Sequence, residues 1–333
     1  MMIDRRLLTA GLAAGFVAAC TRQEPKAASG PTKVRLATDW RAEAEHGGFY
    51  QALATGEYDR RGLAVQIIQG GPGVNVPQLL AAGAAEFGIG SNAFIVMNLA
   101  AEKAPVKAVM ACFQKDPQVL IAHPNAGVAS LADMKGHPIL LADASVGAFW
   151  VWLKAKYGFS DAQVRKYTFN SAPFLADPRA VQQGYVTSEP YTIEKASGVK
   201  PAVFLLADYG YPGYAAMVLA RDALITAQPA TVKAFVEATA AGWKSYLEGD
   251  PAPAEALIRK DNPEMTPDVL AQARAKLKSY GVVAPPGTPI GEMTDARWKA
   301  FFDVASSQGV YPKTLDYRAA YTLAFLPERR DVS

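Results

Sequence analysis

The strongest constraint on the fold lies between Lys33 and Ser91, where short apolar runs alternate with helical patterns. The first apolar run ends at Asp39-Trp40, and an amphipathic helical pattern then continues until it meets a glycine. A second apolar run, 64–69, ends in a glycine-rich turn, and a further helix leads to a third run that closes at Ser91. This alternation predicts βαβ units and therefore an α/β fold with a largely parallel sheet.

Polar and aromatic residues that follow these strands are candidate ligand contacts. In a βαβ unit ligands bind where strands end and helices begin, because backbone N–H groups are free there. Trp40 predicts a stacking platform for a planar ligand, although a core Trp fits the same pattern. Asp39 either accepts a hydrogen bond from the ligand or caps the next helix, and His46 faces the cleft, the surface or the core. The candidates in this half of the chain are Asp39, Trp40, His46, Gly71, Ser91 and Asn92.

Residues 1–19 are predicted to be an export signal peptide. Arg5 and Arg6 precede an apolar run of about 13 residues, which is shorter than the roughly 20 needed to span a bilayer. Small residues lead from this run to Cys20, which resembles the lipid-carrying cysteine of a bacterial lipoprotein box. An ordinary signal peptide with a chance cysteine is the alternative, and the arginine pair leaves Sec and twin-arginine export both open.

Residues 20–31 are predicted to be a lipidated cysteine and a flexible tether, because the residues after Cys20 are mostly small or polar and include proline and glycine. The folded part is expected to begin near Thr32, in the periplasm or another extracytoplasmic space, with the lipid as its membrane anchor. Lipidation of Cys20 would leave Cys112 as the remaining cysteine, and the apolar run around Cys112 predicts a buried, inert thiol.

Composition narrows the class of protein. Half of the 333 residues are hydrophobic and 20% are charged, which is typical of a globular protein long enough for two lobes. The net charge of +3 comes from interspersed signs, so the sequence predicts no nucleic-acid partner. Two cysteines and three scattered histidines form no metal-ligand pattern, and neither a metal nor a cofactor is predicted.

Beyond residue 113 the strand and helix pattern starts again, and the chain then returns to a helical C-terminal part. We therefore predict lobe I from residues 32–113 and 214–333, and lobe II from residues 114–213. The two connections would form a hinge beside a ligand cleft, as in proteins that close around a ligand.

The second lobe supplies its own candidate contacts. Ser145 and Phe149 lie near a predicted helix N-terminus, whose free N–H groups suit a carboxylate, phosphate or sulfonate. Glu189 stands in a Tyr/Ser/Pro setting that suits an amine or amidine-like edge, although a solvent-exposed loop Glu is the alternative. Tyr185 and Tyr191 flank Glu189 and are predicted to line the same pocket.

Several of these patterns together resemble a known family, the solute-binding lipoproteins of ABC importers, in the NMT1/THI5-like branch that also contains thiamine-pyrimidine synthases and riboflavin- and sulfonate-type binders. The matching patterns span about residues 33–250 and are Asp39-Trp40, Gly62-Leu63-Ala64-Val65, Leu80-Ala81-Ala82-Gly83 with Glu86-Phe87-Gly88, and Gln183-Gly184-Tyr185 with Ser188-Glu189-Pro190. The resemblance implies a type II periplasmic-binding-protein fold, two α/β lobes with a ligand cleft between them. It also implies that Trp40 stacks on a pyrimidine ring and that Glu189 meets the ring amine.

The synthases of this branch are enzymes, and this sequence departs from them at the relevant strand. They carry a Lys that holds pyridoxal phosphate and a His four residues later, whereas this chain has Gly90-Ser91-Asn92-Ala93-Phe94-Ile95. A Schiff base requires an amine, so we predict a binding protein and not an enzyme.

The resulting functional prediction is a binding protein, expected to be monomeric, that closes on a small planar heterocycle and delivers it to the permease and ATPase subunits of an ABC importer. The first expected ligand is a thiamine-precursor pyrimidine. A sulfonate, riboflavin or another aromatic nutrient is the alternative for the same role.

Overall fold

A computed structural model describes residues 30–326 of the chain. The predicted signal peptide, Cys20 and most of the predicted tether therefore lie outside the described residues. The described chain from Pro31 onward belongs to one compact unit and contains two five-stranded sheets.

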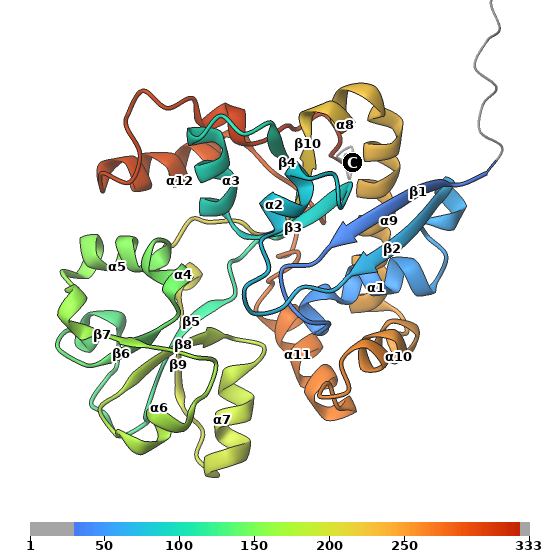
Figure 1. Cartoon of the computed structure of the whole chain (residues 1–333). Helices are drawn as coiled ribbons and strands as arrows, with labels where there is room; N and C mark the ends of the chain where they lie inside the picture. The colour runs from blue at the N-terminus through green and yellow to red at the C-terminus, as the bar shows by residue number, and fades with distance from the viewer. Residues whose placement is uncertain (1–29, 327–333) are drawn as a thin grey trace, which may run out of the picture. The chain divides into compact units, whose positions relative to one another are not determined.

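The first sheet has the strand order β2-β1-β3-β10-β4 (Figure 1). Its strands are β1 (Thr32–Ala37), β2 (Leu63–Ile68), β3 (Phe87–Asn92), β4 (Val106–Phe113) and β10 (Ala215–Arg221). β1 pairs in parallel with both β2 and β3, so the carboxyl ends of these three strands lie at one edge of the sheet. This is the edge at which the sequence predicts ligand contacts.

The second sheet has the strand order β7-β6-β8-β5-β9. Its strands are β5 (Gln118–Ala122), β6 (Ile139–Leu141), β7 (Val164–Lys166), β8 (Val181–Tyr185) and β9 (Ala202–Leu205). The chain therefore leaves the first sheet after β4, builds the whole second sheet, and returns as β10 (Figure 1). The two α/β lobes expected from the sequence are confirmed.

The expectation of largely parallel sheets was wrong, because both sheets are mixed. In the first sheet β10 runs antiparallel to β3 and β4. In the second sheet β5 runs antiparallel to β8 and β9. The reason is the two crossings: β5 and β10, the strands by which the chain enters a lobe at the hinge, run opposite to the strands beside them.

Helices cover both sheets (Figure 1). They are α1 (Gly47–Ala54), α2 (Val76–Ala81), α3 (Ala93–Ala101), α4 (Asp143–Val146), α5 (Phe149–Tyr157), α6 (Ala172–Ala176), α7 (Glu189–Ser197), α8 (Asp222–Ala227), α9 (Pro229–Glu248), α10 (Ala252–Asp261), α11 (Pro267–Ser279) and α12 (Asp295–Ser307). Short 3₁₀ turns are η1 (Ala44–His46), η2 (Asp59–Arg61), η3 (Leu131–Met134), η4 (Asp161–Gln163), η5 (Leu206–Tyr209) and η6 (Tyr317–Ala320).

Two glycines let α1 lie directly on α9. A Cβ on Gly47 would lie 2.2 Å from the ring of Tyr246, and one on Gly48 would lie 2.2 Å from the ring of Trp243. No larger residue fits at either position without displacing α9. This contact fixes the start of α1 and therefore the η1 turn that precedes it, which carries residues of the candidate site.

The two crossings between the sheets are held by one arginine. The guanidinium of Arg297, on α12, donates to the carbonyl oxygens of Gln114 on one crossing and of Pro212 and Gly213 on the other. It also lies 4.0 Å from the ring centre of Tyr214. Arg297 thus ties the strands of the hinge together.

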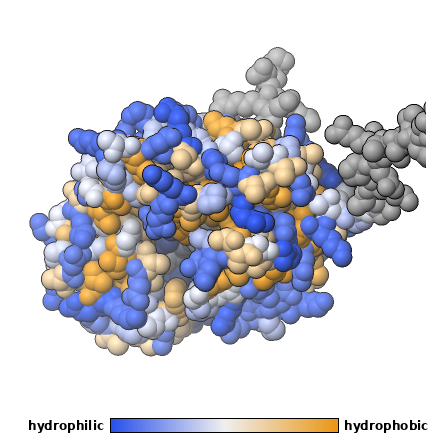
Figure 2. Space-filling view, turned by 45° about the horizontal axis from the view of Figure 1, so that its top comes forward, coloured by the Kyte–Doolittle hydropathy of each residue, from blue (hydrophilic) through white to orange (hydrophobic). Residues whose placement is uncertain are grey.

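The surface in Figure 2 mixes hydrophilic and hydrophobic side chains over the face it shows. Among the described helices none is long and apolar enough to cross a membrane. Cys112, on β4, is fully buried, and burial raises the pKa of its thiol far above the usual range. The sequence prediction of a buried, inert thiol is confirmed.

Candidate functional site

The loop after β1 is held in place by a close approach of two backbones. A Cβ on Gly70, just after β2, would lie 2.2 Å from the carbonyl oxygen of Thr38. Because Gly70 has none, its N–H can donate to the carbonyl of Trp40 at 3.2 Å. The hydroxyl of Thr38 donates to the same carbonyl at 2.7 Å. The glycine-rich turn thus fixes the backbone that presents Asp39 and Trp40.

Three of the predicted residues meet at the carboxyl edge of the first sheet. The Nε2 of His46 donates to one carboxylate oxygen of Asp39 at 3.2 Å, and the hydroxyl of Ser91 donates to the other. His46 is only 3% exposed, and its Nδ1 has no hydrogen-bond partner among residues 30–326. Asp39, from the end of β1, and Ser91, from β3, therefore form a polar site with the imidazole.

Two further carboxylates, Glu43 and Glu45, lie beside this site and were missed by the sequence analysis. Glu45 belongs to η1 and Glu43 immediately precedes that turn. The available signal was three acidic residues and a histidine within eight positions, with a single arginine among them. Nothing in that pattern indicates that the side chains meet residues of the second lobe.

Glu189 opens α7 and folds back over the end of β8. Its Oε2 accepts a hydrogen bond from the backbone N–H of Tyr185 at 2.8 Å, and its Oε1 accepts one from the hydroxyl of Tyr167 at 3.3 Å. A Cβ on Gly184 would lie 2.8 Å from the Cβ of Glu189. The glycine of the Gln183-Gly184-Tyr185 pattern is therefore required for Glu189 to occupy this place.

The residues of the two lobes are in contact across the cleft. Trp40 packs against Phe169 with ring centres 4.9 Å apart, and Phe169 lies 5.3 Å from Tyr167. The hydroxyl of Thr187 donates to Glu45. Phe169 is 53% exposed and has a positive φ of 61°, which is an uncommon conformation for an aromatic residue and is often found at functional sites.

The four carboxylates (Asp39, Glu43, Glu45 and Glu189) are close enough to influence one another. Burial, and then the negative charges of Glu45, Asp39 and Glu189, raise the pKa of Glu43 well above its ordinary value. Burial also raises the pKa of Glu45 and of Glu189, although hydrogen bonds to each carboxylate oppose the change. We call these four residues the carboxylate cluster.

Tyr185 interacts electrostatically both with the carboxylate cluster and with Asp116 of the hinge. Burial, followed by the charges of Asp116, Asp39, Glu43 and Glu45, raises the pKa of the Tyr185 phenol. Asp116 lies in the crossing between β4 and β5 and is 1% exposed. Burial raises the pKa of Asp116 to about 7, against a hydrogen bond from the N–H of Gln118 and the charge of Arg297.

The structure places other predicted contact residues in different roles. Asn92 caps α3 by accepting a hydrogen bond from the N–H of Phe94 at 3.1 Å. The hydroxyl of Tyr191 donates to Asp268 of α11 at 2.6 Å. Ser145 and Phe149 are 6% and 2% exposed, and Phe149 packs in a hydrophobic core.

Gly71 lies in the turn between β2 and α2, where a Cβ would meet only the side chain of Arg41, at 3.9 Å. Its position therefore does not itself require a glycine. Among residues 30–326, no hydrogen bond, ion pair or ring contact joins Gly71, Ser145 or Phe149 to the carboxylate cluster.

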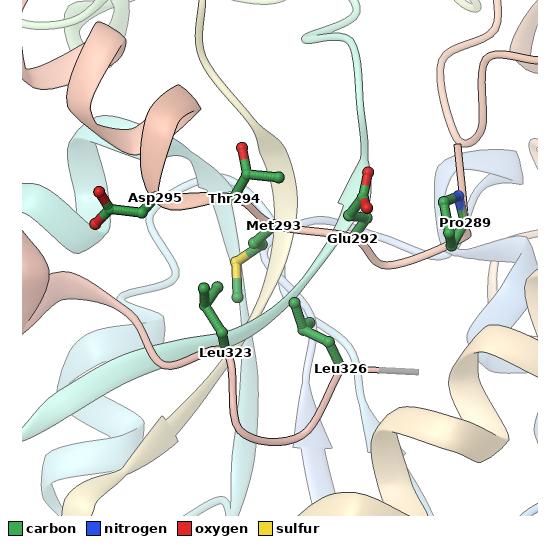
Figure 3. Close-up of a pocket in the computed structure, with 7 residues that line it drawn as sticks. All are labelled: Pro289, Glu292, Met293, Thr294, Asp295, Leu323 and Leu326. Carbon is green, nitrogen blue, oxygen red and sulfur yellow. The ribbon is translucent and has the colours of Figure 1, made fainter. Parts of the chain in front are cut away.

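A separate cavity of about 280 Å³ lies beside the C-terminal segment. Its lining residues are Pro289, Glu292, Met293, Thr294, Asp295, Leu323 and Leu326. In Figure 3, Leu323 and Leu326 point toward Met293, whereas Asp295 points away from them. None of these residues belongs to the carboxylate cluster. Across residues 30–326 no three His, Cys, Asp or Glu side chains are arranged to hold a metal ion.

Comparisons with known proteins agree with the family that the sequence patterns indicate. Residues 43–254, more than half of the chain, match the family described as NMT1/THI5 like. The riboflavin-binding protein RibY of Chloroflexus aurantiacus is 28% identical over 271 residues, which are 74% of this chain and 75% of that protein.

Among solved structures, the periplasmic aliphatic sulphonate binding protein SsuA from Escherichia coli is similar with a TM-score of 0.68. The two proteins are 15% identical, and the match covers 91% of this chain and 96% of SsuA. The desulfurization enzyme DSZB is also similar, with a TM-score of 0.56 and 10% identity over 88% of this chain and 97% of DSZB. These two structures have the same fold as this chain, and the fold occurs both in a binding protein and in an enzyme.

The family match covers both crossings of the hinge and the segment from Glu43 to Glu189, which contains three of the four cluster carboxylates. The two mixed sheets are those of the periplasmic-binding-protein fold. This chain therefore belongs to the NMT1/THI5-like family.

Proposed function

We propose that this chain is the extracytoplasmic solute-binding component of an ABC importer, and that it captures a small planar heterocycle bearing an amino group. An aminopyrimidine precursor of thiamine is the first candidate. The permease and ATPase subunits would be its partners, with Cys20 as the site of a lipid anchor and a monomer as the working form. The protein would bind and release its ligand without making or breaking a covalent bond.

One observation carries this proposal: an aromatic path leads from the first lobe to a carboxylate of the second. Trp40 contacts Phe169, Phe169 contacts Tyr167, and the hydroxyl of Tyr167 donates to Glu189. A planar ring with an amino edge fits such a path, because the ring can stack on the aromatics while the amine donates to the carboxylate.

Opening of the cleft would admit the ligand between the two lobes. Trp40 and Phe169 contact each other at 4.9 Å, whereas a ring stacked between them needs their planes about 7 Å apart, or two carbon contact distances. Insertion would therefore replace one aromatic contact with two. Movement of one lobe relative to the other provides this space in hinged binding proteins.

A flavin is the second candidate, favoured by the relative named as a riboflavin-binding protein. Its ring system is planar, and the hydroxyl groups of its side chain can donate to carboxylates. A sulfonate fits less well, because the four carboxylates would repel it. Within residues 30–326 the only basic side chain bonded to any of them is His46, which donates to Asp39.

A thermal-shift screen tests the proposal. The full chain is incubated with aminopyrimidines, flavins and sulfonates, and a ligand at 100 times its dissociation constant should add about 2.7 kcal/mol to the unfolding free energy. Trp40→Ala and Glu189→Gln should abolish the shift. Glu194→Gln, on the exposed side of the same helix, should retain it.

Each outcome has a distinct meaning. A shift with an aminopyrimidine that both site variants lose supports the proposal. A shift with flavins or sulfonates alone retains the importer role and rejects the aminopyrimidine. Equal shifts in wild type, Trp40→Ala and Glu189→Gln would place the ligand elsewhere in the molecule.

A further inference from the structure

Glu43 differs from the other three members of the carboxylate cluster in its partners. Asp39 accepts hydrogen bonds from His46 and Ser91, Glu45 accepts one from Thr187, and Glu189 accepts two, from Tyr185 and Tyr167. The carboxylate of Glu43 has no hydrogen bond or ion pair within the part of the chain that the structure describes. Glu43 is partly exposed, and a negative charge there is costly because Glu45, Asp39 and Glu189 repel it. A positive group that pairs with Glu43 would remove this cost.

The cluster is assembled from both lobes. Glu43, Glu45 and Asp39 come from the first lobe, and Glu189 comes from the start of α7 in the second. Closing the lobes therefore brings like charges together, which opposes closure in proportion to their ionisation. A cation between them would reverse this effect and favour the closed form.

His46 gives an independent indication of what the cluster binds. Its side chain is 3% exposed, and its Nε2 is already used by Asp39. Its Nδ1 has no partner in residues 30–326. With the proton on Nε2, where it donates to Asp39, the free Nδ1 is an acceptor. A buried acceptor without a partner is rare, and an N–H group of a ligand would satisfy it.

One kind of ligand suits all the features of this site, which are four carboxylates, a free imidazole nitrogen and two aromatic rings in contact. A planar cation with N–H groups donates to the carboxylates and to Nδ1, and its positive charge is attracted to the faces of Trp40 and Phe169. We propose that the ligand of this cleft carries a positive charge, and that Glu43 is the residue that selects charged over neutral ligands. This inference rests on the proposed function, since it concerns the same cleft.

The first test compares two aminopyrimidines that differ in one group. 4-Amino-5-aminomethyl-2-methylpyrimidine has an ammonium side arm at pH 7, and its 5-hydroxymethyl analogue has a neutral one. Titration calorimetry on the full chain should show at least about tenfold tighter binding of the aminomethyl compound, as expected for a charge-assisted contact. Glu43→Gln should remove this preference, and Glu102→Gln, an exposed carboxylate at the end of α3, should retain it.

Equal affinities of wild type for the two compounds, unchanged in Glu43→Gln, would overturn the selection of charge and leave the proposed function standing. Binding of neither compound would instead reject the aminopyrimidine of the proposed function. The charge inference is then decided by benzamidine and benzamide, which have the same planar shape and differ in charge. Greater thermal stabilisation by benzamidine, lost in Glu43→Gln, supports the inference, and no difference between the two probes overturns it.

A measurement without any ligand gives a second readout. The titratable groups that interact with Glu43 are Asp39 and Glu45 from the first lobe and Glu189 and Tyr185 from the second, while His46 interacts with Glu45 and Asp39. Because the folded protein holds the proton of Glu43 more tightly than the unfolded chain does, stability is present at acid pH and falls as the pH rises above about 4.5. The melting temperature of Glu43→Gln should fall less between pH 5 and pH 8 than that of wild type, and identical slopes would contradict the proposed uncompensated charge.

Discussion

The two ends of the parallel strands in the first sheet each carry a carboxylate, and these carboxylates are held in opposite ways. At the amino end Glu86, just before β3, accepts hydrogen bonds from the side chain of Arg35 on β1 at 2.7 and 3.0 Å and from its backbone N–H at 2.8 Å. This pairing with Arg35 lowers the pKa of Glu86. At the carboxyl end Glu43 has no such partner among the described residues, and burial raises its pKa.

A carboxylate paired within the fold, such as Glu86, stabilises the folded protein, whereas the unpaired carboxylate of Glu43 is available to a ligand. The Glu86–Arg35 pair links β1 to the start of β3, and no ligand is needed to balance its charges. The carboxylate cluster has more negative than positive groups, and it lies at the carboxyl ends of the strands, where α/β proteins bind their ligands.

The hinge carboxylate Asp116 should behave like the carboxylate cluster and not like Glu86. Burial raises the pKa of Asp116 to about 7, so its ionised form destabilises the fold, and the loss grows as the pH rises from about 4 through 7. Asp116→Asn should raise the unfolding free energy at pH 8 by up to about 4 kcal/mol. Urea unfolding at pH 8 and pH 5 would measure this gain and its decrease at the lower pH.

The exposed Asp59→Asn is the matched control and should change stability little at either pH. A gain in Asp116→Asn that is the same at both pH values would show that ionisation is not its cause.

Gly184→Ala should remove the place that Glu189 occupies. The added methyl would lie 2.8 Å from the Cβ of Glu189 and 2.9 Å from Ile121, so we expect a loss of about 1–3 kcal/mol in unfolding free energy. Ligand binding should weaken as well. Gly147→Ala, where a Cβ would meet nothing within 4 Å, should leave both quantities almost unchanged. Full ligand affinity in Gly184→Ala would argue against a role for Glu189.

Glu86→Gln and Glu43→Gln should change stability in opposite directions. At pH 7 the first should lower the melting temperature and the second should raise it, each by about 2–4 °C, with the effect at Glu86 damped because Arg35 is partly exposed. The stabilisation from Glu86 is present above about pH 4.5 and disappears as the pH falls through its lowered pKa.

Thermal unfolding of both variants from pH 3 to pH 8 checks the signs. If both variants were less stable than wild type at pH 7, the ionised form of Glu43 would stabilise the fold, as that of Glu86 does, and the prediction would be wrong.

The smallest effect is expected at the surface contact between α7 and α11. Asp268 accepts hydrogen bonds from the hydroxyl of Tyr191 at 2.6 Å and from the ammonium of Lys195 at 2.9 Å. These partners lie on the helix that begins with Glu189, so Asp268→Asn should speed ligand release by about two- to fivefold, in the range of exposed ion pairs. Stopped-flow dissociation at low and high salt measures it, and a rate that salt does not change in wild type would exclude an electrostatic role.

Much of the site was predictable because its components are local. Asp39 and Trp40 follow a strand, and Ser91 lies near the end of another, and the apolar runs of both strands are visible in the sequence. The pattern Gln183-Gly184-Tyr185 before Glu189 marks a tight turn into a helix. The need for glycine at Gly70 and Gly184 also follows local geometry, but only the structure shows which atoms a Cβ would meet.

The residues that were missed are those whose importance depends on a distant partner. Glu43, Glu45 and Phe169 have ordinary local surroundings in the sequence. In the fold, Glu45 bonds to Thr187, Phe169 packs on Trp40, and Glu43 interacts electrostatically with Glu189. Tyr191 and Asn92 were predicted to contact ligand, whereas the structure gives their polar groups a helix partner and a cap.

Periodicity and turn residues act over a few positions, so the amino-acid sequence was enough to predict the α/β class, the two lobes, the buried state of Cys112 and the ends of the first three strands. The mixed sheets became visible only in the folded molecule, as did the meeting of four carboxylates from segments up to 150 positions apart, from Asp39 to Glu189. The physical reason is that burial and charge repulsion depend on distance in space, and folding sets those distances after the local patterns have formed.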